Sequence, residues 1–206
     1  MKVLLINGSP KAEGNTAFAL KQMVEVFQAE GIETEIIQVG NQLIRGCTGC
    51  GSCYKIGKCV FDDIVNETAE KLQHADGLVL GSPVYYASPN GTLLSFLDRL
   101  FYSSGSVDKR MIVGSSVVVA RRGGCTASMD VLNKYFTISQ MPVASSTYWN
   151  IIHGAKPGEA EQDAEGIRTM RNLARNMVFL MRSVAMAKNS IGLPENEKKV
   201  FTNFIR

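Results

Sequence analysis

The cysteines of this chain are concentrated in one short stretch. They follow the spacing C-x2-C-x2-C-x5-C at Cys47, Cys50, Cys53 and Cys59, with three glycines among them. Closely spaced thiolates on a flexible backbone can hold an iron–sulfur cluster, and small residues between them permit N–H···S bonds to it. Free thiols, a redox-active disulfide or a tetrahedral zinc ion are the alternatives, although structural zinc usually takes two C-x2-C pairs with a longer insert. Cys125 lies outside this spacing and is expected to be a half-buried thiol.

A second chemical feature lies at the beginning of the chain. An apolar run at 3–6 is followed by a polar loop at 8–16 and then by apolar residues at helical spacing. This order of strand, loop and helix forms an anion site, because unpaired N–H groups and the positive end of the helix dipole converge there. We expect Asn15 or Thr16 to be the helix N-cap. The candidate anion-binding residues are Ser9, Lys11, Gly14, Asn15 and Thr16.

The same loop lacks two common nucleotide motifs. A Walker P-loop needs Gly-Lys followed by Ser or Thr, whereas Gly14 is followed by Asn15 and Thr16. The dinucleotide pattern G-x-G-x-x-G is also absent, which disfavours a tightly held NAD. A phosphate held by hydroxyls and amides suits FMN. An ordinary turn between strand and helix is the alternative.

The remaining pattern predicts alternating strands and helices. We expect strands at 3–7, 34–39, 76–83, 112–120 and 143–149. We expect helices at 17–27, 62–72, 89–102, 126–138 and 159–187, and a short tail helix holding Val200, Phe201 and Phe204. The alternation predicts an α/β fold with a doubly wound, five-stranded parallel sheet in the flavodoxin order 2-1-3-4-5, followed by a C-terminal helical extension.

Two further loops should border the crevice at the carboxyl ends of these strands, where ligands of such sheets bind. The loop at 82–91 combines prolines that stiffen it with tyrosines that offer flat surface, although the tyrosines could simply be rim aromatics. In the loop at 120–126, Gly123 and Gly124 would allow a close backbone approach to a ligand. Arg121 and Arg122 could meet a phosphate or an acidic partner, or be solvated.

Composition limits the classes of protein to consider. With 206 residues and 45% apolar composition, the chain can form one sizeable core. The net charge of +3 is mild and the basic residues are scattered, so no nucleic-acid partner is expected. No signal peptide or membrane-spanning run is visible, so we expect a cytoplasmic protein that does not bind membranes. We expect one domain at 1–187, with the cysteine-rich insertion at 46–60, and a tail at 188–206.

The stretch from Ile6 to Thr16 resembles the phosphate loop of the flavodoxin-like NAD(P)H-dependent FMN reductase family. Together with the cysteine run, it is similar to the iron–sulfur flavoprotein branch of that family. The resemblance implies FMN, a [4Fe-4S] cluster on the four cysteines and NAD(P)H as a transient co-substrate. It also implies a homodimer or homotetramer, because in that family the cluster lies near the flavin of a neighbouring subunit. It further implies that the flavin ring lies along the 82–91 loop at Pro83, Val84, Tyr85, Tyr86 and Asn90, with the loop of Gly123 and Gly124 at its border.

These features together predict an FMN-dependent oxidoreductase. The flavin carries the redox chemistry, so no catalytic acid–base residue is required, and none stands out. The electron acceptor would be a quinone, nitro or azo compound, or a ferredoxin-like redox partner would exchange electrons with the flavin and cluster. A non-enzymatic flavodoxin-type electron carrier and a thiol- or metal-sensing binding protein are the alternatives.

Overall fold

Strands and helices alternate along the chain in the structure, a computed structural model that describes residues 1–205. The strands are β1 (Lys2–Asn7), β2 (Glu33–Gln38), β3 (Gly77–Tyr85), β4 (Ser88–Pro89), β5 (Val113–Ala120) and β6 (Ile151–His153). The helices are α1 (Asn15–Ala29), α2 (Cys53–Ile56), α3 (Ile64–Leu72), α4 (Gly91–Ser103), α5 (Cys125–Ile138), the 3-10 turn η1 (Glu159–Gln162) and α6 (Ala164–Ile191).

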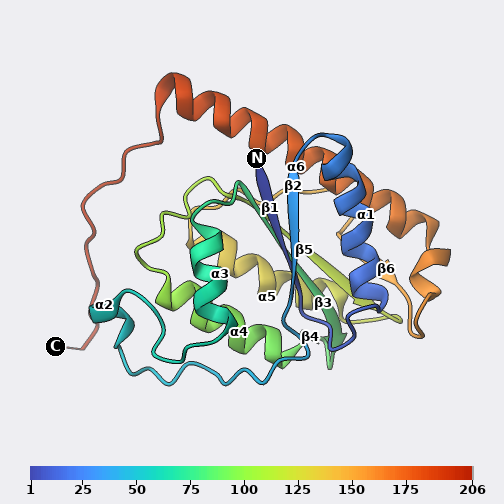
Figure 1. Ribbon diagram of the computed structural model, residues 1–206, viewed down its shortest axis with the longest axis horizontal. Coiled ribbons are helices and arrows are strands. Elements are labelled where there is room, and N and C mark those ends of the chain that lie inside the picture. The colour runs from blue at the N-terminus through green and yellow to red at the C-terminus, as the bar shows by residue number, and fades with distance from the viewer. Residues whose placement is uncertain (206) are drawn as a thin grey trace.

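The sheet has the predicted topology. Its strands lie in the order β2-β1-β3-β5-β6, and all these neighbours pair in parallel. The two-residue strand β4 pairs only with β3, in the antiparallel sense, so β5 and β6 are the fourth and fifth parallel strands. The predicted order 2-1-3-4-5 and the doubly wound α/β fold are therefore confirmed (Figure 1).

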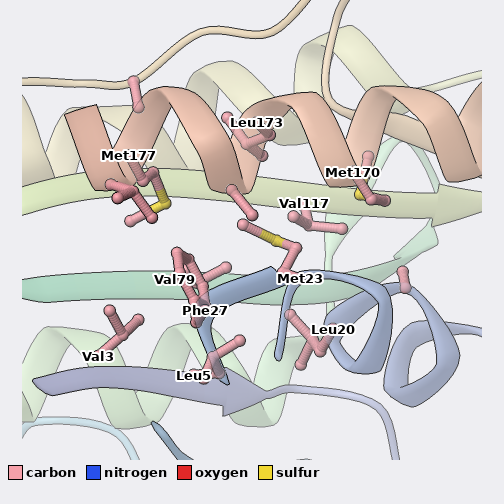
Figure 2. Close-up of a cluster of buried hydrophobic side chains, with 14 of the residues drawn as sticks. Val3, Leu5, Leu20, Met23, Phe27, Val79, Val117, Met170, Leu173 and Met177 are labelled. Atoms are coloured by element: carbon pink, nitrogen blue, oxygen red, sulfur yellow. The ribbon is translucent and has the colours of Figure 1, made fainter. Parts of the chain in front are cut away.

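Helices cover both faces of this sheet: α1 and α6 lie on one face, and α3, α4 and α5 on the other (Figure 1). Successive side chains of a strand point to opposite faces, so each strand supplies both layers. In β1, Val3 and Leu5 pack toward α1 and α6, whereas Leu4 and Ile6 pack on the other side. Figure 2 shows the first layer, where Met23 and Phe27 of α1 meet residues of α6 and the central strands. This explains the nearly continuous apolar runs of the strands.

The predicted fifth strand was wrong in its position. Val143 makes only an isolated bridge with Gly114, and the regular strand β6 begins at Ile151. The buried hydroxyl of Ser115 explains the break, because it donates to the carbonyl of Ala144 at 3.3 Å and accepts from the side chain of Asn150 at 3.1 Å. The chain leaves the sheet edge between these two partners and rejoins it afterwards.

The C-terminal predictions also need correction. The last helix begins at Ala164 rather than at 159, because Gly158 takes a left-handed conformation (φ +85°) and the Asp163 side chain caps the helix by accepting from Gly166 N at 2.8 Å. No helix forms at Val200, Phe201 and Phe204, whose side chains are exposed. Among residues 1–205, no helix is both long enough and apolar enough to cross a membrane.

The loop after β2 fixes the loop after β1 by close backbone contact. The amide of Gly40 donates to the carbonyl of Asn7 at 3.1 Å. A Cβ at Gly40 would overlap the backbone of Gly8 and Ser9, and a Cβ at Gly8 would lie 2.7 Å from Leu93 Cδ2. These glycines therefore allow the polar loop that follows β1 to lie against its neighbours.

We expect Gly40→Ala to destabilise the protein by about 1–3 kcal/mol, because the new methyl group overlaps backbone that cannot move aside as a flexible side chain would. Urea unfolding followed by circular dichroism measures the change. Gly91→Ala is the control, since no heavy atom lies within 4 Å of a Cβ at that first residue of α4. Equal unfolding midpoints for the Gly40 variant and the unaltered protein would contradict this account.

Candidate flavin crevice and cysteine site

A cavity of about 270 Å³ lies where the central strands end. The loops after β1, β5 and β6 and the last residues of β3 line it, as expected for a doubly wound sheet. The structure brings together all five residues predicted for the anion site and three of those predicted for the ring: Ser9, Lys11, Gly14, Asn15, Thr16, Pro83, Val84 and Tyr85. These eight residues form two of the walls of the cavity.

Side chains at the ends of two strands hold the first wall in place. Asn7 donates to the side chain of Gln38 at 2.7 Å, and Gln38 in turn donates to the carbonyl of Ser9 at 2.7 Å. Asn7 Oδ1 also accepts from the amide of Ser9 at 3.0 Å. The hydroxyl of Ser9 accepts from the amide of Lys11 at 3.1 Å, which leaves its proton available to a ligand. The loop is thus shaped before any ligand binds.

The start of α1 forms the electropositive part of this wall. The N-cap is Gly14, without any side-chain cap, so the prediction of Asn15 or Thr16 as N-cap was wrong. Both residues belong to the first turn, where Thr16 is buried. That turn carries no acidic residue, so nothing in it neutralises the positive end of the helix dipole. Phosphate fits such a site, because helix N-termini bind anions through backbone N–H groups.

The second wall is the end of β3. Tyr86 and Ala87 form a tight turn with positive φ angles of 51° and 58°, and β4 then returns beside β3. Such angles are unfavourable for residues other than glycine, so this hairpin is held by its surroundings. A Cβ at Gly124 would lie 2.8 Å from Ala87 Cα, and Gly124 itself has φ +87°. Close packing on this glycine therefore supports the turn.

Four predicted residues lie outside the cavity lining: Tyr86, Asn90, Gly123 and Gly124. Tyr86 is fully exposed at the tip of the turn. Asn90 is buried and caps α4 by accepting from Thr92 N at 2.7 Å. No heavy atom lies within 4 Å of a Cβ at Gly123. These residues surround the wall, and Asn90 and Gly124 support it structurally.

The sequence reasoning missed the wall that follows β6. Gly154, Ala155 and Pro157 line the cavity, with Val119, Ala120 and Arg121 from the end of β5. Asn15 connects this wall to the first one, because its side chain donates to the carbonyl of Lys156 at 3.0 Å and accepts from the amide of Ala160 at 3.3 Å. Correct placement of the fifth strand at 151–153 would have identified this loop from its position.

The four clustered cysteines line one small hollow beside α4, together with Arg99 and Tyr102 of that helix. Cys47 and Cys50 lie in a segment without helix or strand, Cys53 begins α2, and Cys59 precedes α3. Gly49, Gly51 and Gly57 have φ angles of +66°, +69° and +74°. The left-handed residues bend the backbone around the hollow, which explains the glycines of the motif.

The donors around these thiols fit an iron–sulfur cluster. The backbone N–H of Ser52, then its hydroxyl and the hydroxyl of Thr48, lower the pKa of Cys50. Arg99 Nε and Nη2 each lie 3.3 Å from Cys59 Sγ and donate to it. Donors that stabilise thiolates are typical of cluster sites. Among residues 1–205, no three His, Cys, Asp or Glu side chains are placed to hold a single metal ion.

Cys125 and His153 do not belong to either site. Cys125 is buried at the start of α5, and burial raises the pKa of its thiol. His153 Nδ1 lies 3.1 Å from the carbonyl of Ala120, and its amide donates to Asp163. Neither residue lines the crevice or the hollow.

Comparisons with known proteins agree with this geometry. A family model of NADPH-dependent FMN reductases matches residues 1–156. The chain is 33% identical over 191 residues to an iron–sulfur flavoprotein of Methanocaldococcus jannaschii, covering 89% of this chain and 99% of that protein. It is 31% identical over 205 residues to an iron–sulfur flavoprotein of Archaeoglobus fulgidus, covering 97% and 98%. The solved structure of RosB with bound 8-demethyl-8-formylriboflavin-5′-phosphate has a similar fold, with a TM-score of 0.70, 17% identity and coverage of 100% and 94%.

In the folded, metal-free protein we expect an alkylating reagent at pH 7 to modify Cys50 at least about tenfold faster than Cys125, because only the thiolate reacts. The hydrogen bonds to Cys50 move the midpoint of its pH–rate profile below the ordinary thiol value, and burial moves that of Cys125 above it. Site-resolved mass spectrometry measures both rates. The double variant Thr48→Val/Ser52→Ala should be alkylated more slowly at Cys50, whereas the alkylation rate of Cys47 should not change. An unaltered pH–rate profile of Cys50 in that variant would refute the role of these two hydroxyls.

Proposed function

This chain belongs to the family of NADPH-dependent FMN reductases, and from that premise we propose how its crevice and its cysteines carry out flavin-dependent oxidoreduction. The phosphate of FMN binds the loop at 8–16, the flavin ring lies against the end of β3, and the four clustered cysteines hold a [4Fe-4S] cluster. The observation that carries this proposal is one cavity in which the uncapped start of α1 faces the end of β3.

The phosphate assignment is supported by the donors of the first wall. Ser9 and Thr16 provide hydroxyls, Lys11 provides a charge, and the first turn of α1 provides free N–H groups. Gly14 has no side chain that could stand between these groups and a ligand. Asn15 fixes the position of the facing wall, because its side chain donates to the carbonyl of Lys156. A dianionic phosphate gains from each of these contacts, so the loop serves as the anchor of the cofactor.

The ring assignment is supported by the shape of the second wall. Pro83, Val84 and Tyr85 line the cavity along the last residues of β3, and the tight turn at Tyr86 and Ala87 holds them there. When bound, FMN accepts a hydride and releases electrons singly or in pairs. The chain's own task is to orient the ring, to exclude water from one of its faces and to leave the other open to NAD(P)H. Gly124 and Asn90 contribute by supporting this wall.

The cluster assignment is supported by four thiols around one hollow and by the donors at Cys50 and Cys59. NAD(P)H is the proposed electron donor, with a quinone, nitro or azo compound as the acceptor, or a ferredoxin-like protein as the redox partner. The exposed apolar side chains of Phe179 and Met186 on α6 suit burial between subunits of a homodimer or homotetramer. The proposed compartment is the cytoplasm, where free cysteines remain reduced.

If the 8–16 loop binds the phosphate, Lys11→Met/Thr16→Val should weaken FMN binding about tenfold or more, because a charged donor and a hydroxyl are lost. Quenching of flavin fluorescence on titration with apoprotein measures the dissociation constant. Riboflavin, which lacks the phosphate, should bind the variant and the unaltered protein equally. Lys21→Met is the matched lysine control, because Lys21 pairs with Glu13 and does not line the cavity.

The same FMN-loaded proteins test the overall reaction. Under anaerobic conditions the unaltered protein should oxidise NADPH or NADH when a quinone is added, and the double variant should regain that rate at high FMN. An equal loss of FMN and riboflavin binding would reject the phosphate assignment. No pyridine-nucleotide oxidation with a quinone, nitro or azo acceptor would reject the proposed donor.

Serine substitution tests the cluster ligands. Each of Cys47→Ser, Cys50→Ser, Cys53→Ser and Cys59→Ser should lower iron and acid-labile sulfide after anaerobic reconstitution, because a hydroxyl is a poor ligand for the cluster. Cys125→Ser is the control and should keep the full content. Iron and sulfide assays with absorption spectra measure the effect. Full iron content in all four variants would show that the cysteines are not the ligands.

A further inference from the structure

Arg99 is a fully buried cation next to the cysteine site. Its side chain is 1% exposed, in the middle of α4. Removing a guanidinium from water is unfavourable unless charge and hydrogen bonds compensate for it. The charge partner is Asp63, whose two oxygens accept from Nη1 at 2.7 Å and from Nη2 at 3.0 Å. Asp63 is itself held, because it caps α3 by accepting from Val65 N at 3.1 Å.

The rest of the guanidinium is directed at Cys59 and its neighbour Phe61. Nε and Nη2 both donate to Cys59 Sγ at 3.3 Å, and Nη2 also donates to the carbonyl of Phe61 at 3.1 Å. The guanidinium carbon lies 5.2 Å from the centre of the Phe61 ring. Arginine's planar fork can serve a carboxylate and a sulfur at once, which an ammonium group cannot do with the same geometry.

The backbone of Cys59 is fixed as well. Asn66 accepts from its amide at 3.0 Å and donates to its carbonyl at 3.0 Å. Cys47 and Cys50, in contrast, are exposed in a segment without regular structure. Among the four clustered thiols of the described chain, Cys59 is thus the one held by both its backbone and its sulfur.

We propose that Arg99 is a positioning residue that fixes Cys59 as the preformed ligand of the cluster and raises the cluster's reduction potential. This inference rests on the proposed cluster. Reduction adds one electron, supplied by the external reductant, and makes the cluster more negative. A buried positive charge with two N–H···S bonds stabilises that reduced form more than the oxidised form, and surrounding protein rather than water preserves the effect.

Removal of the charge tests the proposal directly. In Arg99→Gln, the ratio of reduced to oxidised cluster at a fixed ambient potential should fall about tenfold, which corresponds to about 59 mV for a one-electron couple. An anaerobic dithionite titration with redox mediators, followed by electron paramagnetic resonance, measures this ratio. Cluster loss to an iron chelator should also become faster, because Cys59 is no longer fixed by its sulfur.

Two further variants separate an effect on the cluster's reduction potential from an effect on folding. Arg99→Met/Asp63→Asn removes both charges together, so no unpaired ion stays buried, and asparagine keeps the cap of α3. It should retain the unfolding midpoint of the apoprotein to within a few degrees and still show the fall in the ratio. Arg45→Gln is the matched control, because Arg45 lies over the same Phe61 ring at 4.7 Å, yet of these two arginines Arg99 is the one that donates to Cys59 Sγ. It should leave the potential unchanged.

The outcomes distinguish this inference from the function on which it rests. A cluster-bearing protein whose potential is the same in the unaltered form and in both Arg99 variants would overturn the role of Arg99 while the cluster stands. An equal shift in Arg45→Gln would also overturn it, since the effect would then be that of any nearby charge. Absence of iron and sulfide in the reconstituted, unaltered protein would overturn the cluster proposal itself.

Discussion

A parallel sheet buried on both faces is the constraint on which the rest of this molecule depends. Because each central strand supplies apolar side chains to two helical layers, a polar side chain along a strand needs a buried hydrogen-bond partner, as Ser115 has. The candidate flavin site accordingly lies at the edge where the strands end, and it is lined by the loops after β1, β5 and β6 and by the last residues of β3. Gly8 and Gly40 matter for the same reason, since they let neighbouring loops meet at that edge without side chains between them.

Helix α4 joins the two candidate sites. Its cap, Asn90, stands beside the turn that supports the flavin wall, while Arg99 and Tyr102 line the cysteine hollow. Gly91 and Arg99 are separated by about 12 Å at the usual helical rise of 1.5 Å per residue. A rigid helix with its apolar face buried against the sheet thus sets the relation between crevice and hollow within one subunit. The ion pair between the buried Arg99 and the partly exposed Asp63 then connects α4 to the start of α3 beside Cys59.

The errors of the sequence reasoning have identifiable physical causes. The valine at 143 suggested a strand, yet the side chain of Ser115 forms hydrogen bonds that divide the sheet edge, and no local pattern reveals such a partner. That single displacement hid the wall formed after β6. Asn15 is a residue type that is common at N-caps, but its side-chain amide donates to the carbonyl of Lys156, more than a hundred residues away in the sequence. Apolar residues near 200 suggested a helix, although they find no core to cover in the described chain.

By itself, the sequence determined the strand order, the two cofactor-type motifs and the family. Periodicity, glycine placement and cysteine spacing are local properties, so they can be read directly along the chain. Eight of the twelve predicted crevice residues line the cavity for the same reason. Only the tertiary structure decided which loops share a wall, that Asn90 and Gly124 support the site rather than line it, and that a buried arginine faces Cys59. Those facts depend on which distant segments meet, and burial and hydrogen-bond pairing across the fold select them.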